Sequence, residues 1–417
     1  MSFETVSVIG LGYIGLPTAA MFASRKKKVI GVDVNQYAVD TINQGKIHII
    51  EPELDMIVHA AVTEGYLKAT TSPESADAFL IAVPTPFKKN TNGDIPEPDL
   101  SYIKAASQAI APVLKKGDLV ILESTSPVGA TEQMAEWLAI ARPDLSFPQT
   151  ASDNADVNVA HCPERVLPGH VVRELVENDR VIGGMSARCS ERAIELYKTF
   201  VEGECVITNA RTAEMAKLTE NSSRDVQIAF ANELSIICDK LDIDVWELIT
   251  LANRHPRVNI LQPGPGVGGH CIAVDPWFIV SKTPNESQLI HVARKVNDSK
   301  PSWVIDKLKL SILDYLQDHP GKTINDVCVA CYGISFKPNI DDLRESPAFS
   351  ITKEIASFHR GPLLVVEPNI SKLDNFELVK QEIAFNKADI HLLLVDHDDF
   401  KLSKPQSNYI VDCKGIW

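Results

Sequence analysis

The sequence lacks an excess of positive charge, a long apolar run and a leader-like N-terminus. Its 417 residues contain 41 Lys and Arg against 55 Asp and Glu, a net charge of −14. A nucleic-acid-binding protein needs a basic face, so we expect no nucleic-acid partner. No apolar run reaches the roughly 18 residues of a membrane span, so we expect no membrane partner. The apolar N-terminus has no basic segment and is interrupted by glycines, which predicts a first strand instead of a signal peptide.

The sequence also lacks clustered cysteines. Its eight cysteines are scattered along the chain, which favours a cytoplasmic protein with reduced thiols. Cys328 and Cys331 have a metal-like spacing, but they lie inside an apolar stretch without a second ligand pair. We therefore interpret them as core residues and expect no metal site.

Hydrophobic residues make up 45% and charged residues 23% of the chain, a composition typical of a globular protein with two or three domains. Short apolar runs alternate with helical patterns in the first part of the chain, which predicts an α/β fold with a doubly wound parallel sheet. The expected strands cover residues 6–9, 29–32, 79–83 and 119–122. Ligands of such sheets bind beyond the carboxyl ends of the strands, where Asp33, Thr85 and Thr125 fall.

The pattern divides the chain into residues 1–209, 210–318 and 319–417. The middle part is predicted to be helical, with a long helix over residues 212–241 that could form a dimer interface. The last part returns to strands and repeats features of the first part. Gly333 follows its first strand, and Glu367 stands where Asp33 stands in the first part. We interpret it as a second, smaller nucleotide-type fold.

Three glycines follow the first expected strand at positions 10, 12 and 15. Glycines at this spacing let the backbone turn and approach a pyrophosphate at a helix N-terminus. Asp33 lies about 20 residues further on, where a carboxylate binds ribose hydroxyls and repels a 2′-phosphate. The pattern predicts binding of NAD. The alternatives are a glycine-rich turn of another α/β protein, or a 2′-phosphate site at the three lysines 26–28, which we interpret instead as a solvated helix end.

A glycine-rich loop places Cys271 directly after Gly268, Gly269 and His270. A structural cysteine usually lies in an apolar strand or helix, whereas a nucleophilic thiol needs access and a lowered pKa. A thiol beside a hydride acceptor could hold an aldehyde covalently. The loop therefore predicts oxidation of an alcohol past the aldehyde to the acid.

Lys217, Asn221 and Arg224 are spaced i, i+4 and i+7 on one expected helix and so share a face. A lysine and an amide at this spacing could stabilise a developing oxyanion, although a plain polar helix surface gives the same pattern. Glu164 follows an expected strand and could activate a water molecule. Lys337 follows a strand end at which phosphates of a second nucleotide could bind.

Together, these motifs resemble the UDP-glucose/GDP-mannose dehydrogenase family along the whole chain. The resemblance rests on VIGLGYIGLP from Val8, VPTP from Val83, ESTSPVG from Glu123, CPERVLPG from Cys162, AEMAKLTENS from Ala213, RHPRVNILQPGPGVGGHCIAVDPWF from Arg254 and GISFKPNIDDLRESP from Gly333. It implies two Rossmann-like doubly wound domains joined by a helical segment, whose long central helix forms a homodimer. It also implies a four-electron oxidation of the C6 alcohol of a UDP-sugar with NAD, in bacterial surface-polysaccharide synthesis.

The resemblance assigns site residues by position. Cys271 would form the thiohemiacetal and thioester, and the other catalytic residues would be Lys217, Asn221, Glu164 and Asp275. The residues that correspond to cofactor positions are Gly10, Gly12, Tyr13, Ile14, Gly15, Asp33, Thr85, Thr125 and Arg344. Those that correspond to UDP-sugar positions are Arg165, Val166, Lys217, Asn221, Arg224, His255, Arg257, Gly268, Phe336, Lys337 and Lys414.

Two departures bear on the sugar. UDP-glucose members usually carry a lysine where this chain has Val274, and they lack the insert Pro263-Gly264-Pro265. Both features favour an N-acetylated sugar over glucose. The expected substrate is UDP-N-acetyl-D-mannosamine, with UDP-N-acetylglucosamine or UDP-glucose as alternatives. A single-hydride hydroxyacid dehydrogenase, whose thiol would be dispensable, and a non-catalytic nucleotide sensor are the competing classes.

Overall fold

The computed structural model describes residues 3–49, 51–88, 95–166, 169–269 and 271–417. The chain forms two compact units. The first comprises Met1–Glu220 and Trp277–Lys282, and the second comprises Asn221–Pro276 and Thr283–Trp417. Within the described residues, no helix is both long and apolar enough to cross a membrane.

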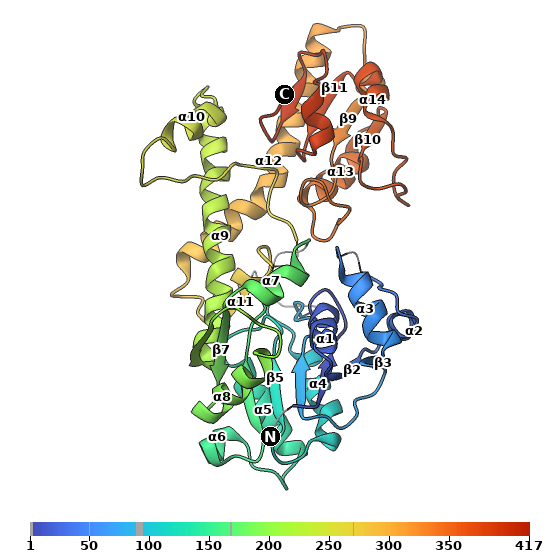
Figure 1. Cartoon of the computed structure of the whole chain (residues 1–417). Coiled ribbons are helices and arrows are strands. Elements are labelled where there is room, and N and C mark those ends of the chain that lie inside the picture. The colour runs from blue at the N-terminus through green and yellow to red at the C-terminus, as the bar shows by residue number, and fades with distance from the viewer. Residues whose placement is uncertain (1–2, 50, 89–94, 167–168, 270) are drawn as a thin grey trace. The chain divides into compact units, whose positions relative to one another are not determined.

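The first unit is built on a sheet with the strand order β3-β2-β1-β4-β5-β6-β7-β8 (Figure 1). Its strands are β1 (Thr5–Ile9), β2 (Lys28–Val32), β3 (Leu67–Thr70), β4 (Ala78–Ile81), β5 (Leu119–Leu122), β6 (Asn158–His161), β7 (Arg180–Gly184) and β8 (Cys205–Asn209). The sheet confirms the predicted α/β class, and β3 is a strand that the apolar pattern did not indicate.

One pair departs from the predicted parallel sheet, because β7 runs antiparallel to β6. The chain leaves β6 at its carboxyl end, and the helix α7 (Val171–Glu177) lies at that edge of the sheet (Figure 1). The next strand therefore runs back toward the opposite edge, and β8 pairs parallel to it.

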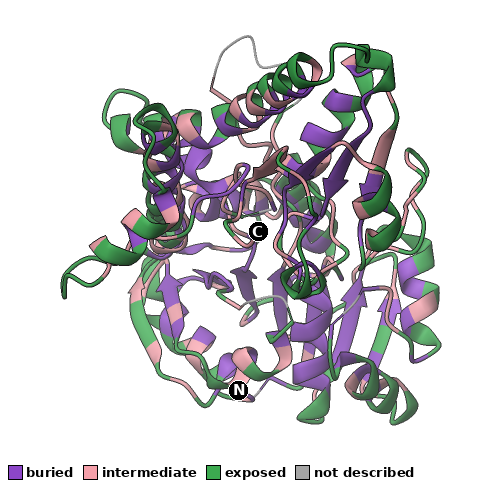
Figure 2. Cartoon of the chain, turned by 90° about the horizontal axis from the view of Figure 1, so that it is seen from above, coloured by how far each residue is buried: buried purple, intermediate pink, exposed green. Residues whose placement is uncertain are grey.

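Helices cover both faces of this sheet. They are α1 (Gly15–Ser24), α2 (Gln36–Asn43), α3 (Leu54–Thr63), α4 (Ser101–Ile110), α5 (Ala130–Ala141), α6 (Pro148–Ala151), α7 and α8 (Ala187–Tyr197). Side chains that alternate along a strand point to opposite faces. Val6 and Val8 of β1 accordingly pack in the cluster that holds α1 and α3, whereas Ile9 packs in the cluster that holds α4 and α5. Figure 2 shows the buried strands between partly exposed helices.

Two long helices, α9 (Ala210–Lys240) and α12 (Gln288–Asp318), form much of the second unit, although α9 begins in the first unit. The shorter α10 (Val245–Ala252) also belongs to the second unit, whereas α11 (Asp275–Lys282) lies mostly in the first. Pro301 lies inside α12 without ending it. A buried ion pair joins the two longest helices, because Nη1 of Arg294 on α12 contacts Asp225 on α9. Asn297 donates to the same oxygen, Oδ1 of Asp225, at 2.8 Å, so this buried oxygen has two partners.

The second unit ends in a parallel sheet with the order β10-β9-β11-β12. Its elements are β9 (Val329–Tyr332), α13 (Pro347–Phe358), β10 (Leu363–Val366), α14 (Gln381–Lys387), β11 (Ile390–Leu393) and β12 (Ile410–Asp412). Val329 and Cys331 pack in one core cluster, whereas Ala330 and Tyr332 pack in the other. The small nucleotide-type fold predicted for this part is thus confirmed, and Cys331 is a buried core residue as expected.

Candidate active site

The predicted phosphate loop connects β1 to α1, and its three glycines are required for two different physical reasons. Gly10 has φ +92°, and a Cβ there would lie 2.6 Å from the carbonyl oxygen of Ala82. A Cβ on Gly15 would overlap the carbonyl oxygen of Gly10. Both positions therefore exclude side chains for close packing. Around Gly12 the space is open to 4 Å, so a ligand can approach its backbone.

Asp33 lies directly after β2 and holds the phosphate loop. Its Oδ2 accepts a hydrogen bond from the backbone N–H of Leu11 at 2.8 Å, and its Oδ1 accepts one from Asn35 at 2.9 Å. The side chain is half-buried, so lone pairs on its accessible side can still accept bonds from ribose hydroxyls.

Hydroxyl groups follow the neighbouring strands. The Oγ1 of Thr85, beyond β4, is buried and has no hydrogen-bond partner among the described residues. Buried polar atoms in proteins are nearly always paired, so this orphaned oxygen marks a place where a ligand is expected. With the open Gly12 and the Asp33 carboxylate, the edge of the sheet fits a dinucleotide.

The remaining predicted cofactor residues fall in two places. Tyr13 and Ile14 follow Gly12 in the phosphate loop, with Tyr13 39% exposed, and Thr125 follows β5. Arg344 belongs to the second unit, where its guanidinium contacts Asp342 at 2.6 Å.

The glycine-rich loop of residues 264–269 is held by the second unit. The N–H of Gly264 donates to Oδ1 of Asn232 on α9 at 2.9 Å, and Asn232 in turn donates to Asn297 at 2.9 Å. A Cβ on Gly268 or Gly269 would lie 2.9 Å from the nearest side-chain atom of Phe336. The loop can therefore pack this closely only because it is built from glycines.

Cys271 is exposed and stands four residues before the first residue of α11. Its carbonyl accepts the N–H of Asp275 at 2.8 Å. His270, the predicted neighbour of the thiol, lies outside the described residues. Asp275 itself is buried, and its Oδ2 accepts a hydrogen bond from the Asn221 amide at 2.5 Å. Lys217 precedes Asn221 by one turn of α9, as predicted.

Glu164 lies in a buried ion-pair network of the first unit. Nη2 of Arg180 contacts Oε2 of Glu164 at 2.7 Å, and Nη1 contacts Glu123 at 3.4 Å. Tyr197 donates to Glu123 at 2.9 Å, and its ring lies 4.3 Å from the guanidinium. Burial raises the pKa of Glu123 to about 7, although the Arg180 charge opposes the rise. The network leaves Glu164 only 9% exposed, in a fixed orientation.

The predicted substrate residues are dispersed over helix α9 and several loops. Arg165 forms an ion pair with Glu220 at 2.7 Å, and Val166 packs against the core cluster that holds α1 and α3. Arg224, His255 and Arg257 are exposed, the first on α9 and the others after α10. Phe336 and Lys337 follow β9, and Lys414 follows β12, with its amino group 3.2 Å from Asp396.

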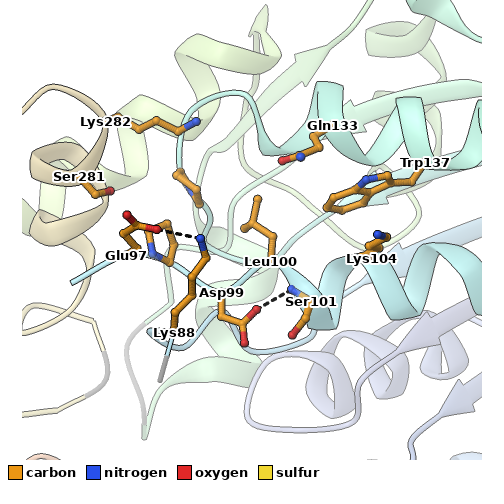
Figure 3. A pocket seen from close by; sticks show the side chains of 12 residues that line it. Lys88, Glu97, Asp99, Leu100, Ser101, Lys104, Gln133, Trp137, Ser281 and Lys282 are labelled. Carbon is orange, nitrogen blue, oxygen red and sulfur yellow. Dashed lines mark hydrogen bonds and ion pairs between the residues drawn. The ribbon is translucent and has the colours of Figure 1, made fainter. Parts of the chain in front are cut away.

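A hollow of about 500 Å³ in the first unit lies apart from these residues (Figure 3). It is lined by three lysines, Trp137 and polar side chains, and none of the predicted site residues contributes to the described lining. Lys88 already contacts Glu97 there at 2.8 Å, as Figure 3 shows. No group of three or more His, Cys, Asp or Glu among the described residues is arranged to hold a metal ion.

Some residues that support the site lie outside its sequence motifs and were not predicted. Arg180 could have been noticed as a charge at the start of an otherwise apolar strand. Asn232 sits on the predicted long helix, and nothing in its neighbourhood indicates that it holds Gly264. His397 is fully buried against Glu367, with 3.1 Å between its Nε2 and Oε2 of the carboxylate.

Comparison with known proteins covers the whole chain. Three models of the UDP-glucose/GDP-mannose dehydrogenase family match it: the NAD binding domain at residues 4–201, the central domain at residues 211–299 and the UDP binding domain at residues 330–417. Among curated relatives, UDP-N-acetyl-D-mannosamine dehydrogenase of Yersinia pestis is 65% identical over 100% of both chains. An NDP-N-acetyl-D-galactosaminuronic acid dehydrogenase of Ralstonia nicotianae is 61% identical over 100% of this chain and 97% of its own.

A solved structure of a member of this family matches the chain over nearly its whole length. The UDP-N-acetyl-mannosamine dehydrogenase of Staphylococcus aureus matches with a TM-score of 0.84 at 40% identity, and the match covers 99% of this chain and 95% of that one. The resemblance inferred from the motifs is therefore confirmed.

Proposed function

Because the chain belongs to the UDP-glucose/GDP-mannose dehydrogenase family, we propose that it oxidises the C6 alcohol of UDP-N-acetyl-D-mannosamine to the carboxylate. The observation that carries this proposal is the full-length relative named for that activity, at 65% identity. The exposed Cys271 on its glycine-built loop supplies the thiol that a two-stage oxidation needs.

NAD is the cofactor, and when bound it accepts the hydride in each of the two oxidations. The phosphate loop, Asp33 and Thr85 would hold it. After the first oxidation, Sγ of Cys271 adds to the C6 aldehyde and forms a thiohemiacetal. The second oxidation turns this carbon into a thioester. Lys217 and Asn221 would stabilise the oxyanions, and Asp275 would help to transfer protons.

Hydrolysis completes the proposed reaction. The oxygen of a water molecule bonds to the thioester carbon while Glu164 accepts a water proton. The C–S bond then breaks, the electron pair stays on Sγ of Cys271, and the sugar leaves as the acid. Arg180 supports this role because it holds Oε2 of Glu164 at 2.7 Å and so fixes the carboxylate.

Support for an N-acetylated sugar comes from Val274 and from the insert Pro263-Gly264-Pro265. Asn232 binds the backbone of this insert, and Gly264 lies beside Lys414, since a Cβ there would be 3.6 Å from its Nζ. The insert thus borders a residue that we assign to the nucleotide sugar. The 61% identical Ralstonia relative carries the name of another N-acetylated sugar, so the sugar must be tested directly.

The test is the yield of NADH per sugar consumed across UDP-N-acetylmannosamine, UDP-N-acetylglucosamine, UDP-N-acetylgalactosamine and UDP-glucose. We expect two NADH per molecule and the highest kcat/KM with the mannosamine. A yield of one would contradict the thioester route. A clear preference for another sugar would leave the chemistry in place and overturn the substrate.

We also propose a homodimer that packs through α9. Phe230 and Ile237 lie seven residues apart on one face of this helix and are 51% and 45% exposed. Analytical sedimentation should give a molecular mass twice that of the chain. The substitution Phe230→Asp should lower this mass toward that of the monomer. Ile140→Asp, at a 79% exposed apolar position of α5, is the control. A monomeric wild-type chain would contradict this proposal.

The division into residues 1–209, 210–318 and 319–417 and the cytoplasmic location stay predictions.

A further inference from the structure

The two sheets carry matching carboxylates. In the first unit Asp33 accepts bonds from Leu11, which follows Gly10, and from Asn35 two residues on. In the second unit Glu367, directly after β10, accepts a bond from Ile334 at 2.8 Å and from Asn369 at 3.0 Å. Ile334 follows Gly333, whose φ of +80° matches the +92° of Gly10. Glu367 therefore occupies the position that binds a ribose in a dinucleotide fold.

Unlike the half-buried Asp33, the carboxylate of Glu367 has no exposed surface and is not accessible to a ligand. Nε2 of His397 lies 3.1 Å from Oε2 of Glu367, and both side chains are 0% exposed. Nδ1 of the same ring faces two donors at 2.9 Å, the N–H of Asn339 and the amide of Asn369. This arrangement makes Nδ1 an acceptor and places the ring proton on Nε2, toward Glu367. Burial tends to raise the pKa of Glu367, but the bonds from His397 and Ile334 outweigh it and the pKa is lowered.

The pair holds both ends of one short loop, residues 334–339. Glu367 binds the backbone of Ile334 and, at 3.3 Å, that of Ser335. His397 binds the backbone of Asn339, whose φ is +62°. Between these anchors lie Phe336 and Lys337, which we assign to the nucleotide sugar. The ring of Phe336 also packs against Gly269 of the loop that precedes Cys271.

We propose that Glu367 and His397 are positioning residues, which set the nucleotide-sugar loop 334–339 from inside the second sheet. In a dinucleotide fold a carboxylate at this position would bind a ribose. Here it accepts hydrogen bonds from the backbone of the loop instead. This inference rests on the proposed function, because that function makes Phe336 and Lys337 ligands of the UDP-sugar.

The experiment compares two buried histidines of the same domain in the full-length enzyme. His397→Phe removes both ring nitrogens from the loop. His391→Phe is the matched control, since His391 is 1% exposed and binds Tyr332 at 2.7 Å, away from the loop. We expect UDP to bind at least about tenfold more weakly to His397→Phe by calorimetry, which corresponds to the loss of one or two hydrogen bonds. The KM for the UDP-sugar should rise with it, while the KM for NAD stays unchanged.

A conservative variant separates positioning from simple loss of stability. The Asn side chain places its oxygen two bonds from Cβ, as His places Nδ1, so His397→Asn keeps an acceptor for the N–H of Asn339. We expect it to recover part of the UDP affinity. If His397→Phe does not fold, Glu367→Gln takes its place, because an amide nitrogen cannot accept the bonds that one of the carboxylate oxygens accepts.

Each remaining outcome is decisive. Wild-type protein that neither binds UDP nor oxidises a UDP-sugar would overturn the proposed function, and the assignment of the loop with it. Wild-type binding that persists unchanged in His397→Phe, or that falls equally in His391→Phe, would leave the function standing and overturn the positioning inference alone.

Discussion

The side-chain amide of Asn221 donates a hydrogen bond to Oδ2 of Asp275 at 2.5 Å. The two residues are 54 positions apart and belong to different helices, α9 and α11. Asp275 is also tied to the chain beside it, because its N–H donates to the carbonyl of Cys271. The proposed oxyanion donor and the residue that carries the proposed nucleophile are therefore both bonded to Asp275, the first to its side chain and the second to its backbone.

Asn221→Ala should lower kcat by roughly 10²- to 10³-fold, the usual effect of removing one oxyanion donor. It also leaves the buried Asp275 without that amide, so part of the loss comes from a displaced carboxylate. Steady-state NADH formation measures the effect. Gln227→Ala, an amide at an exposed position of the same helix, should keep normal turnover. Equal losses in both variants would show a general disturbance of α9.

Cys271→Ser should reduce formation of the acid by about 10³-fold or more, because the covalent intermediate is lost. Product analysis by mass spectrometry should then show aldehyde or unreacted sugar in place of the acid. Cys205→Ser, at a half-buried thiol of β8, is the control. Full turnover of Cys271→Ser would favour the single-hydride dehydrogenase.

Asp33→Ser should weaken the preference for NAD over NADP. The change removes a carboxylate that would repel a 2′-phosphate, and it also releases the N–H of Leu11 in the phosphate loop. The ratio of kcat/KM for the two coenzymes should move toward NADP by at least about tenfold, or 1.4 kcal/mol. Asp40→Ser, at an exposed position of α2, should leave the ratio unchanged. A constant ratio in Asp33→Ser would contradict the ribose assignment.

Lys300 should make stability depend on pH. It is 2% exposed, donates to Ser235 and lies 3.6 Å from the ring of Trp303. Burial lowers its pKa from 10.5 to about 8. Between pH 8 and pH 10.5, Lys300 is protonated in the unfolded chain and neutral in the folded protein. The free energy of unfolding therefore rises by up to about 3 kcal/mol across this range. Below pH 8 this contribution is absent.

Lys300→Met removes this titration. Urea unfolding at pH 7 and pH 10 should show the wild-type chain gaining stability relative to the variant at the higher pH. Lys309→Met, at an exposed position of the same helix, should follow the wild-type pH dependence. An equal difference between wild type and Lys300→Met at both pH values would show that Lys300 does not titrate in this range.

The local features of the fold could be predicted from the sequence. Strand β5 has the predicted bounds, because a short run of apolar residues directly indicates a buried strand. The reversed strand β7 could not be predicted, since its direction depends on where the chain leaves β6 and α7. Strand β3 was missed because Lys68 interrupts its short apolar run.

By itself, the sequence determined the phosphate loop with Gly10, Gly12 and Asp33, and it singled out Cys271 on its glycine-rich loop. These features follow from residues close together in the chain, whose spacing sets their geometry. Only the tertiary structure decided that Arg180 holds Glu164, that Asn221 holds Asp275, and that His397 closes off Glu367. Such pairs form because the folded chain buries charged or polar groups that must then find partners, and no local pattern records which partner lies within reach.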